Sequence, residues 1–296
     1  MILGRPRHIK RMKNYLFDIR TWNFNTILKA GTMQESADQI VGSQIQIVAL
    51  QEIRWRGYGL LKKGKYSIYY SCNPNTTGQA GTGFVIQNSA MNKIAGFEPI
   101  SDCICKLRKK GKFYTITLLN IYTPMEDKEE NIKEQIYEEL QRTHDRVPKH
   151  DIIIIVGDMN AKLGKEKVFS KVVGRHTLHN ISKVNGEMVA NYAISNDMFL
   201  ISSNFQHKKI HTGTWISPDH QTINQTSHIM VSKEKIRLIH DVRSKRGYNC
   251  DSDRFLVQIK IKRKLIPVRN GQIQKYKRDR QLINQKEKIN KYQENL

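Results

Sequence analysis

Cysteine is scarce in this chain of 296 residues, which has four: Cys72, Cys103, Cys105 and Cys250. Cys103 and Cys105 flank a single residue, a spacing too tight for the usual zinc-binding pair. The spacing favours small apolar residues of a strand. A chain of this length can bury a core without disulfides, and we expect a reducing compartment, nuclear or cytoplasmic, rather than secretion.

Long hydrophobic runs are also missing. The longest, I-I-I-I-V at 152–156, is far below the roughly 20 residues of a membrane span and is typical of a buried strand. The stretch M-I-L-G-R-P-R-H-I-K-R is basic and leads into no apolar segment, so we expect no signal peptide. With 39% hydrophobic residues, the chain can form one large or two small domains.

Acidic residues are few. The chain has 27 Asp and Glu residues and 50 Lys and Arg residues, which gives a net charge of +23 and a pI near 9.9. Residues 260–296 contribute +9, from 12 basic and 3 acidic side chains, so the remaining 259 residues carry +14. Such a positive field favours a polyanion as partner, with nucleic acid first and an anionic membrane second. A lysine-rich composition without such a partner is the alternative that composition leaves open.

Short apolar runs predict strands, and charged segments with helical periodicity separate them. The predicted strands cover residues 15–20, 45–50, 66–71, 83–87, 113–122 and 151–156, and the predicted helices residues 32–42, 127–144 and 185–198. Ile132, Ile136 and Leu140 are four residues apart and predict a buried stripe on their helix. Strands with intervening helices are typical of an α/β domain. We expect three parts: a basic N-terminal extension (1–14), the α/β domain (15–264) and a basic, helical or disordered tail (265–296).

Acidic, amide and phenolic residues follow the strands, where α/β sheets collect their ligand sites. They are Asn23, Glu52, Tyr122, Asp158, Asn160, Asp251 and Asp253. Each alone is typical of a turn or a cap, and G-D-M-N at 157–160 alone is an ordinary Asx-type turn. Together they predict a site of hard oxygen ligands that suits Mg²⁺ or Mn²⁺, and the near absence of histidine and cysteine argues against zinc.

The chemistry of these residue types predicts how such a site would act. A Mg²⁺ held by Glu52 would polarise a phosphoryl oxygen and stabilise the leaving oxygen. The amides of Asn23 and Asn160 could orient a phosphate without adding negative charge. The Tyr122 hydroxyl could donate a hydrogen bond to a developing oxyanion. Two tryptophans are candidates for stacking on DNA, although we favour packing in the core or at its rim for both of them: Trp55 and Trp215.

At these residues the chain resembles the endonuclease/exonuclease/phosphatase superfamily, and within it the apurinic-like endonuclease domain of RTE-class LINE retrotransposons. The segments that carry the resemblance are T-W-N (21–23), A-L-Q-E-I-R-W (49–55), G-T-G-F (81–84), N-I-Y-T-P (120–124), V-G-D-M-N-A-K-L-G (156–164), T-W-I-S-P (214–218), N-Q-T-S-H-I (224–229) and C-D-S-D (250–253). The resemblance implies a DNase I-like α/β fold, a four-layer sandwich of two packed mixed β-sheets flanked by helices. It also implies Mg²⁺-dependent nicking of DNA, and we expect a monomer without a small-molecule cofactor.

Matched motif by motif, the resemblance implies a metal site and a phosphate site. The metal ligands would be Glu52, Asp253 and Asn23. The residues that act in catalysis would be Tyr122, Asn23, Asn160 and Asp158. Of these, Asp158 would activate or orient the attacking water, while Tyr122 and Asn160 would contact the phosphate.

Two positions depart from the family pattern, which has Asp-His in place of both Ser227-His228 and Asp253-Arg254. The aspartate of the first pair and the histidine of the second would form one hydrogen-bonded dyad. Ser227 carries no charge and Arg254 cannot exchange a proton near neutral pH. We therefore expect cleavage to be lowered by at least about 10²–10⁴-fold, with Arg254 as a fixed cation that can pair with a phosphate. His228 is a poor substitute, because strand alternation points it to the face opposite residue 227.

Three functions follow as hypotheses. The first is a DNA endonuclease with impaired, Mg²⁺-dependent nicking, derived from a retrotransposon. The second is a catalytically dead nucleic-acid-binding module on the same fold. The third is another phosphodiesterase, such as a lipid phosphatase or a sphingomyelinase; it needs the same missing histidine, and the sequence has no obvious lipid-facing apolar loop. A remnant without function is the remaining alternative.

Overall fold

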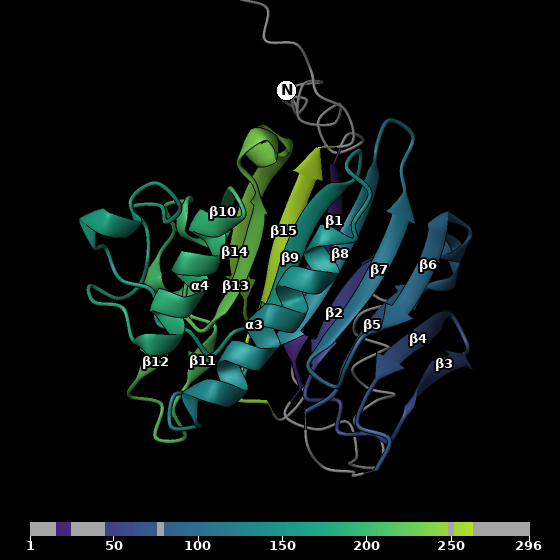
Figure 1. Ribbon diagram of the computed structural model, residues 1–296, viewed down its shortest axis with the longest axis horizontal. Coiled ribbons are helices and arrows are strands. Elements are labelled where there is room, and N and C mark those ends of the chain that lie inside the picture. Colours follow the sequence, from purple (N-terminus) through teal and green to yellow (C-terminus); the bar gives the residue numbers. More distant parts are fainter. Residues whose placement is uncertain (1–15, 25–44, 76–79, 248–251, 263–296) are drawn as a thin grey trace, which may run out of the picture. The chain divides into compact units, whose positions relative to one another are not determined.

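The computed structural model describes residues 16–24, 45–75, 80–247 and 252–262. Two mixed β-sheets form the centre of this part of the chain (Figure 1). From edge to edge, the seven-stranded sheet contains β14 (Ile239–Lys245), β15 (Leu256–Lys262), β1 (Leu16–Asn23), β2 (Ile47–Gln51), β5 (Thr82–Gln87), β4 (Tyr66–Ser71) and β3 (Tyr58–Lys63). Some of the predicted features lie outside the described residues. They are the extension 1–14, the helix 32–42, the tail 265–296, Cys250 and Asp251.

The second sheet has six strands, and two helices pack on its outer face. Its strands are β10 (Met198–Leu200), β13 (Ser227–Ser232), β9 (Ile152–Asp158), β8 (Thr115–Tyr122), β7 (Ile104–Lys110) and β6 (Ile94–Pro99). The helices are α3 (Glu130–Asp145) and α4 (Val184–Ser195), and a separate hairpin consists of β11 (Trp215–Ile216) and β12 (Ile223–Asn224). Within the described ranges, no helix combines the length and the apolar character that a membrane crossing requires.

The uninterrupted apolar run of β9 is explained by its position. Ile152, Ile154 and Val156 point into the core between the two sheets. Ile153 and Ile155 point to the other face, where they join the cluster formed with α3 and α4. A strand buried on both faces needs apolar residues at every position, so the prediction for this strand is confirmed. Two packed sheets and the helices on one of them account for three of the four predicted layers.

All six predicted strands are present, with bounds that differ by a few residues. Several of the strands that the sequence did not predict are short or irregular, although β7 and β14, with seven residues each, were not predicted either. β10, β11 and β12 have two or three residues, and β6 contains a register shift between Ile94 and Gly96. β3 is an edge strand whose side chains are nearly all exposed, so it shows no apolar alternation. Edge strands bury little and therefore leave a weak pattern in a sequence.

One predicted core residue of helix α3 is wrong. Ile136 and Leu140 are buried as predicted, but Ile132 is 42% exposed. Lys133 is buried in its place, and its Nζ donates a hydrogen bond to the carbonyl oxygen of Glu126 at 2.7 Å. The ammonium group thus ties the first turn of the helix to the preceding loop, and the apolar stripe begins one turn later.

The two parallel strand pairs place the ends of four strands together. β1 pairs in parallel with β2, and β8 with β9, while every other pairing in the two sheets is antiparallel. Beneath these ends, buried Asn120 of β8 links the sheets: its Nδ2 donates to the carbonyl oxygens of Leu50 (2.8 Å) and Gly83 (2.9 Å). Its Oδ1 accepts a hydrogen bond from Gln51 Nε2 at 2.6 Å. A fully paired polar bridge of this kind fixes the offset of the sheets and hence the relative position of the strand ends.

Candidate active site

The strand ends bring the predicted polar residues to one edge of the fold. In the registers of the sheets, Asn23 lies beside Gln51, the residue before Glu52. Tyr122 lies beside Asp158, and Asp158 lies beside Ser227. Parallel strands end at the same edge of a sheet, which is why residues far apart in the sequence meet there.

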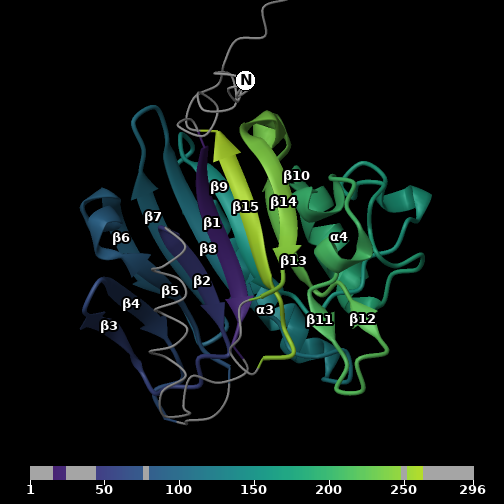
Figure 2. The same ribbon diagram turned by 180° about the vertical axis from the view of Figure 1, so that it is seen from behind.

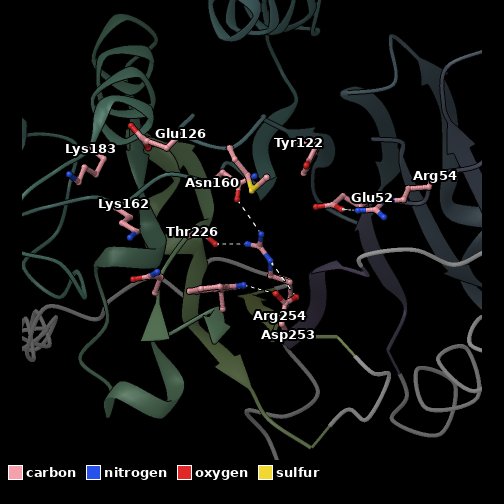
Figure 3. Close-up of a pocket in the computed structure, with 13 residues that line it drawn as sticks. Glu52, Arg54, Tyr122, Glu126, Asn160, Lys162, Lys183, Thr226, Asp253 and Arg254 are labelled. Atoms are coloured by element: carbon pink, nitrogen blue, oxygen red, sulfur yellow. Dashed lines mark hydrogen bonds and ion pairs between the residues drawn. The ribbon is translucent and has the colours of Figure 1, made fainter. Parts of the chain in front are cut away.

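A cavity of about 460 Å³ opens at this edge (Figure 3). Most of the residues that line it are polar or charged, and they carry both signs of charge. The lining residues are Glu52, Arg54, Tyr122, Met125, Glu126, Asn160, Lys162, Lys183, Trp215, Asn224, Thr226, Asp253 and Arg254. Of the predicted site residues, Glu52, Tyr122, Asn160, Asp253 and Arg254 line it, whereas Asn23 and Asp158 lie in contact with lining residues.

Asn23 holds the two central carboxylates in place. Its Nδ2 donates to Glu52 Oε1 at 2.7 Å and to Asp158 Oδ2 at 2.9 Å. Glu52 also forms an ion pair with Arg54, whose Nη2 lies 2.5 Å from Oε2. Because all of these groups except Arg54 are buried, their mutual orientation is fixed by the hydrogen bonds rather than by water.

The backbone at the cavity is held in an uncommon conformation. Glu52, Arg54 and Asn160 have positive φ angles of 54°, 61° and 44°. Non-glycine residues in this region cost about 1–3 kcal/mol each and persist where surrounding bonds enforce them. Here the Arg54 amide donates to the Ala80 carbonyl at 2.9 Å, and Asn160 Nδ2 donates to the Thr123 carbonyl at 2.8 Å. The concentration of such residues at one cavity is typical of a functional site.

Tyr122 is placed to act as a hydrogen-bond donor. Burial raises the pKa of Tyr122 well above its ordinary value, and the negative charges of Glu52 and Asp158 raise it further. The phenol therefore keeps its proton throughout the physiological pH range. It faces the cavity beside Glu52 (Figure 3), where a protonated hydroxyl can donate to an anionic oxygen.

Arg254 occupies the centre of the site (Figure 3). Its Nη1 lies 2.8 Å from Asp158 Oδ2 and donates to Thr226 Oγ1 at 2.9 Å, and its Nη2 donates to Asn160 Oδ1 at 3.3 Å. The guanidinium is thus engaged by Asp158 in this structure, and the pairing of Arg254 with a phosphate stays a prediction. Oδ2 of the buried Asp158 also accepts from Asn23, and Oδ1 accepts from the backbone N–H of Asn160 at 3.2 Å, so both oxygens already have partners.

Asp253 and Trp215 form a second fixed pair. Trp215 Nε1 donates to Asp253 Oδ2 at 2.6 Å, which holds the indole at the wall of the cavity. Asp253 Oδ1 is buried, makes no hydrogen bond within the described residues, and lies 3.8 Å from Arg254 Nε. Trp55, in contrast, packs edge-on against Tyr70 with ring centroids 5.0 Å apart. Trp215 is therefore the tryptophan that faces the site.

Ser227 and His228 lie on opposite faces of β13, as strand alternation requires. Ser227 lines a separate cavity of about 10 Å³, which it shares with His211 and Ser244. His228 is fully buried, and its Nε2 donates to the Ala161 carbonyl at 2.8 Å while its Nδ1 accepts from Ser202 at 3.1 Å. Within the described residues, neither side chain forms a hydrogen bond with Arg254.

Burial also makes His228 a source of acid sensitivity. It lowers the pKa of His228 from its usual value of 6.5 to about 4. Between these pH values the unfolded chain binds a proton that the folded chain excludes, so the free energy of unfolding should fall by roughly 3 kcal/mol from pH 6.5 to pH 4. Urea denaturation across this range measures the fall. His228→Gln keeps a donor for the Ala161 carbonyl but does not titrate, and an equally steep fall in that variant would assign the effect to other groups.

The sequence did not single out several residues of the cavity. Arg54 lies within the quoted motif A-L-Q-E-I-R-W, but nothing in the motif indicates that its side chain returns to Glu52 two residues earlier. Lys162 and Lys183 come from the loop before α4, on the side of the cavity opposite Glu52 (Figure 3). Loop residues of this kind carry no periodicity, so only the tertiary structure assigns them to a site.

The fold and the site define an α/β protein of two packed sheets with an oxygen-rich site at the ends of its parallel strands. The chain belongs to the Endonuclease/Exonuclease/phosphatase family, whose profile matches residues 21–237. It is 27% identical to craniofacial development protein 2 of Tragulus javanicus over 253 aligned residues. The aligned region covers 84% of this chain and 43% of that protein. The chain thus spans less than half the length of this relative.

Solved structures share the fold. The catalytic domain of Xenopus laevis APE2 aligns with a TM-score of 0.62 and 15% identity, over 83% of this chain and 92% of that one. The endonuclease domain of TRAS1, a telomere-specific non-LTR retrotransposon, aligns with a TM-score of 0.57 and 14% identity. This alignment covers 83% of this chain and 98% of that domain. The predicted membership of this superfamily, the predicted likeness to a retrotransposon endonuclease domain and the predicted two-sheet α/β fold are therefore confirmed.

The residues of the cavity fit a divalent cation of the hard type. Glu52 and Asp253 supply carboxylate oxygens to the same cavity, and one oxygen of Asp253 is buried without a hydrogen bond. In the part of the chain that the structure describes, no three His, Cys, Asp or Glu side chains cluster closely enough to hold a metal by themselves. Mg²⁺ is commonly bound through one or two carboxylates with water and substrate oxygens completing its shell, so this donor set suits Mg²⁺ or Mn²⁺ and not zinc.

Proposed function

We propose that this chain is a DNA-binding, Mg²⁺-dependent endonuclease domain whose phosphodiester cleavage is impaired. The observation that carries this proposal is the ion pair of Arg254 with Asp158 at 2.8 Å. Asp158 is the residue that the family motif assigns to the attacking water. The guanidinium occupies Oδ2 of this carboxylate, one of the two oxygens that would hold the water, while the rest of the oxygen-rich site is retained.

Each side chain has a role in this proposal. Glu52 would hold the cation, with Asp253 and Asn23 beside it; Asn23 would act mainly by orienting the two carboxylates to which its amide nitrogen donates. The cation, when bound, supplies positive charge that polarises the phosphate. Tyr122 donates a hydrogen bond to a phosphate oxygen. Lys162 and Lys183, on the side of the cavity opposite Glu52, attract the DNA backbone.

A catalytically dead DNA-binding module is the second candidate. It is favoured by a specific feature: both central carboxylates are ion-paired to arginines of the chain itself, Glu52 to Arg54 at 2.5 Å and Asp158 to Arg254. Binding of a polyanion needs neither carboxylate to be free. The two candidates differ only in whether any cleavage remains.

Supercoiled plasmid with Mg²⁺ separates the two candidates. We expect slow conversion to nicked circles by the wild-type chain and none by Glu52→Ala, because the variant loses the carboxylate that would hold the cation. Nicking at the same rate by Glu52→Ala would contradict the metal site. DNA retardation that weakens with salt, without nicks in either protein, would establish the binding module instead.

A further inference from the structure

Four cations lie on two segments that meet at the end of β14, and we call them the basic rim: Lys208, Lys209, Lys245 and Arg246. Lys245 ends β14, and Lys209 begins the short 3-10 helix η4 (Lys209–His211). Two bonds to the carbonyl oxygen of Ile210 join these segments, one from Arg246 Nε at 3.2 Å and one from Ser244 Oγ at 3.3 Å. Figure 2 shows the end of β14 near the hairpin of β11 and β12.

The basic rim lies beside segments that line the active-site cavity. The Arg246 guanidinium lies over the ring of Phe255, 4.1 Å from its centroid. Phe255 directly follows Arg254, which lines the cavity, and its amide donates to the Thr214 carbonyl at 2.8 Å. Thr214 in turn precedes Trp215, which also lines the cavity. A DNA strand that lies across the cavity toward β14 would therefore meet the basic rim next.

The charge of the basic rim is not balanced by nearby carboxylates. Within the described ranges, none of its four residues forms an ion pair, and three of them are exposed. The carboxylate of Asp241 is already bonded to Arg243 at 2.6 Å and to His207 at 2.9 Å. Burial, followed by the positive charges of Arg243, Lys260 and Arg20, lowers the pKa of Lys245. Like charges held together in this way are stabilised by a bound polyanion.

We propose that the basic rim binds the phosphate backbone of duplex DNA beside the phosphate that enters the cavity; this proposal rests on the proposed function. Stacking on Phe255 fixes the plane of the Arg246 guanidinium, and its Nε is used by Ile210. Its two Nη groups are left for a phosphate, which arginine binds through two parallel hydrogen bonds. Lys208 and Lys209 add mobile point charges. Such contacts set the register of a duplex without reading its sequence.

The test removes three exposed charges of the rim and compares them with three charges elsewhere. The rim variant is Lys208→Gln/Lys209→Gln/Arg246→Gln. The control is Lys62→Gln/Lys63→Gln/Lys65→Gln, which removes the same charge from the exposed end of β3 and the turn that leads to β4. That turn lies at the end of the seven-stranded sheet opposite the active site, because Tyr58 and Ser71 mark the active-site end of these strands. Binding to a 30-base-pair duplex is measured in EDTA at several salt concentrations, after thermal unfolding shows that both variants fold.

The wild-type chain and the control should show the same salt dependence. The rim variant should show a plot of log affinity against log salt that is shallower by about 0.9 for each phosphate it no longer neutralises, or roughly 2–3 in all. Equal flattening in rim variant and control would mean that only net charge matters and would overturn the proposal. An unchanged slope in the rim variant would also overturn the proposal. The same holds if the rim variant loses binding to phosphatidylserine vesicles while its DNA binding stays intact. If the wild-type chain binds no duplex at all, the proposed function itself fails.

Discussion

Replacing Ser227 by Asp and Arg254 by His in one chain should raise plasmid nicking by about 10²–10⁴-fold, the range that positioned acid–base groups supply. Removing the guanidinium frees Asp158 from its 2.8 Å ion pair. The new imidazole can exchange a proton near neutral pH, which arginine cannot. The new carboxylate at position 227 would orient that imidazole. The measurement is the initial rate of nicked-circle formation in Mg²⁺.

The single variants divide this effect into its parts. Arg254→His alone should give a smaller gain, because Asp158 is freed but the imidazole is not oriented. Ser227→Asp alone should give none, since Arg254 still occupies Asp158 and cannot exchange a proton near neutral pH. Adding Glu52→Ala to the double variant should remove the restored activity. A double variant that folds, binds DNA and nicks no faster than wild type would show that the dyad assignment is wrong.

Replacing Gly157 by Ala should cost more than about 4 kcal/mol of stability or prevent folding, since severe overpacking is among the few mechanisms that reach such values. A Cβ at Gly157 would lie 1.8 Å from the Ile121 carbonyl oxygen and 2.8 Å from its carbonyl carbon. Gly157 and Ile121 are partners in the parallel pairing of β9 with β8. The strands would have to separate just before Tyr122 and Asp158. Urea denaturation of purified protein measures the cost.

Gly96→Ala is the matched control. A Cβ at Gly96 meets no atom within 4 Å, although this glycine also lies in a strand of the same sheet. The free energy of unfolding of this variant should change by less than about 1 kcal/mol, as is usual for surface positions. If Gly157→Ala were as stable as Gly96→Ala, the close approach of β8 and β9 at the active site would be incorrect.

Strand patterns were informative where burial was regular. The run at 152–156 predicted a strand buried on both faces, and β9 is such a strand because a sheet lies on one side and helices on the other. The pattern failed at Ile132, where a buried lysine that bonds a backbone carbonyl replaces the expected apolar residue. Periodicity reports which side of an element is apolar, but it does not report where the neighbouring layer begins.

For the predicted site residues, the sequence likewise indicated some features of the site and not others. Glu52, Tyr122, Asn160, Asp253 and Arg254 line one cavity, as expected of residues that follow strands of one edge. Their pairing could not be predicted. Arg254 meets Asp158 and Thr226 rather than Ser227, and Arg54 returns to Glu52. Side-chain partners depend on rotamers and on the offset of the two sheets, which no local pattern encodes.

The sequence by itself determined the composition of the site, the positive charge of the chain and the family, because these depend on which residues stand in which order. The tertiary structure alone decided that arginines pair with both central carboxylates and that cations from the end of β14 and the start of η4 lie on segments that meet. The physical reason is that ion pairs form over a few ångströms in space, between residues whose distance along the chain is set by the fold.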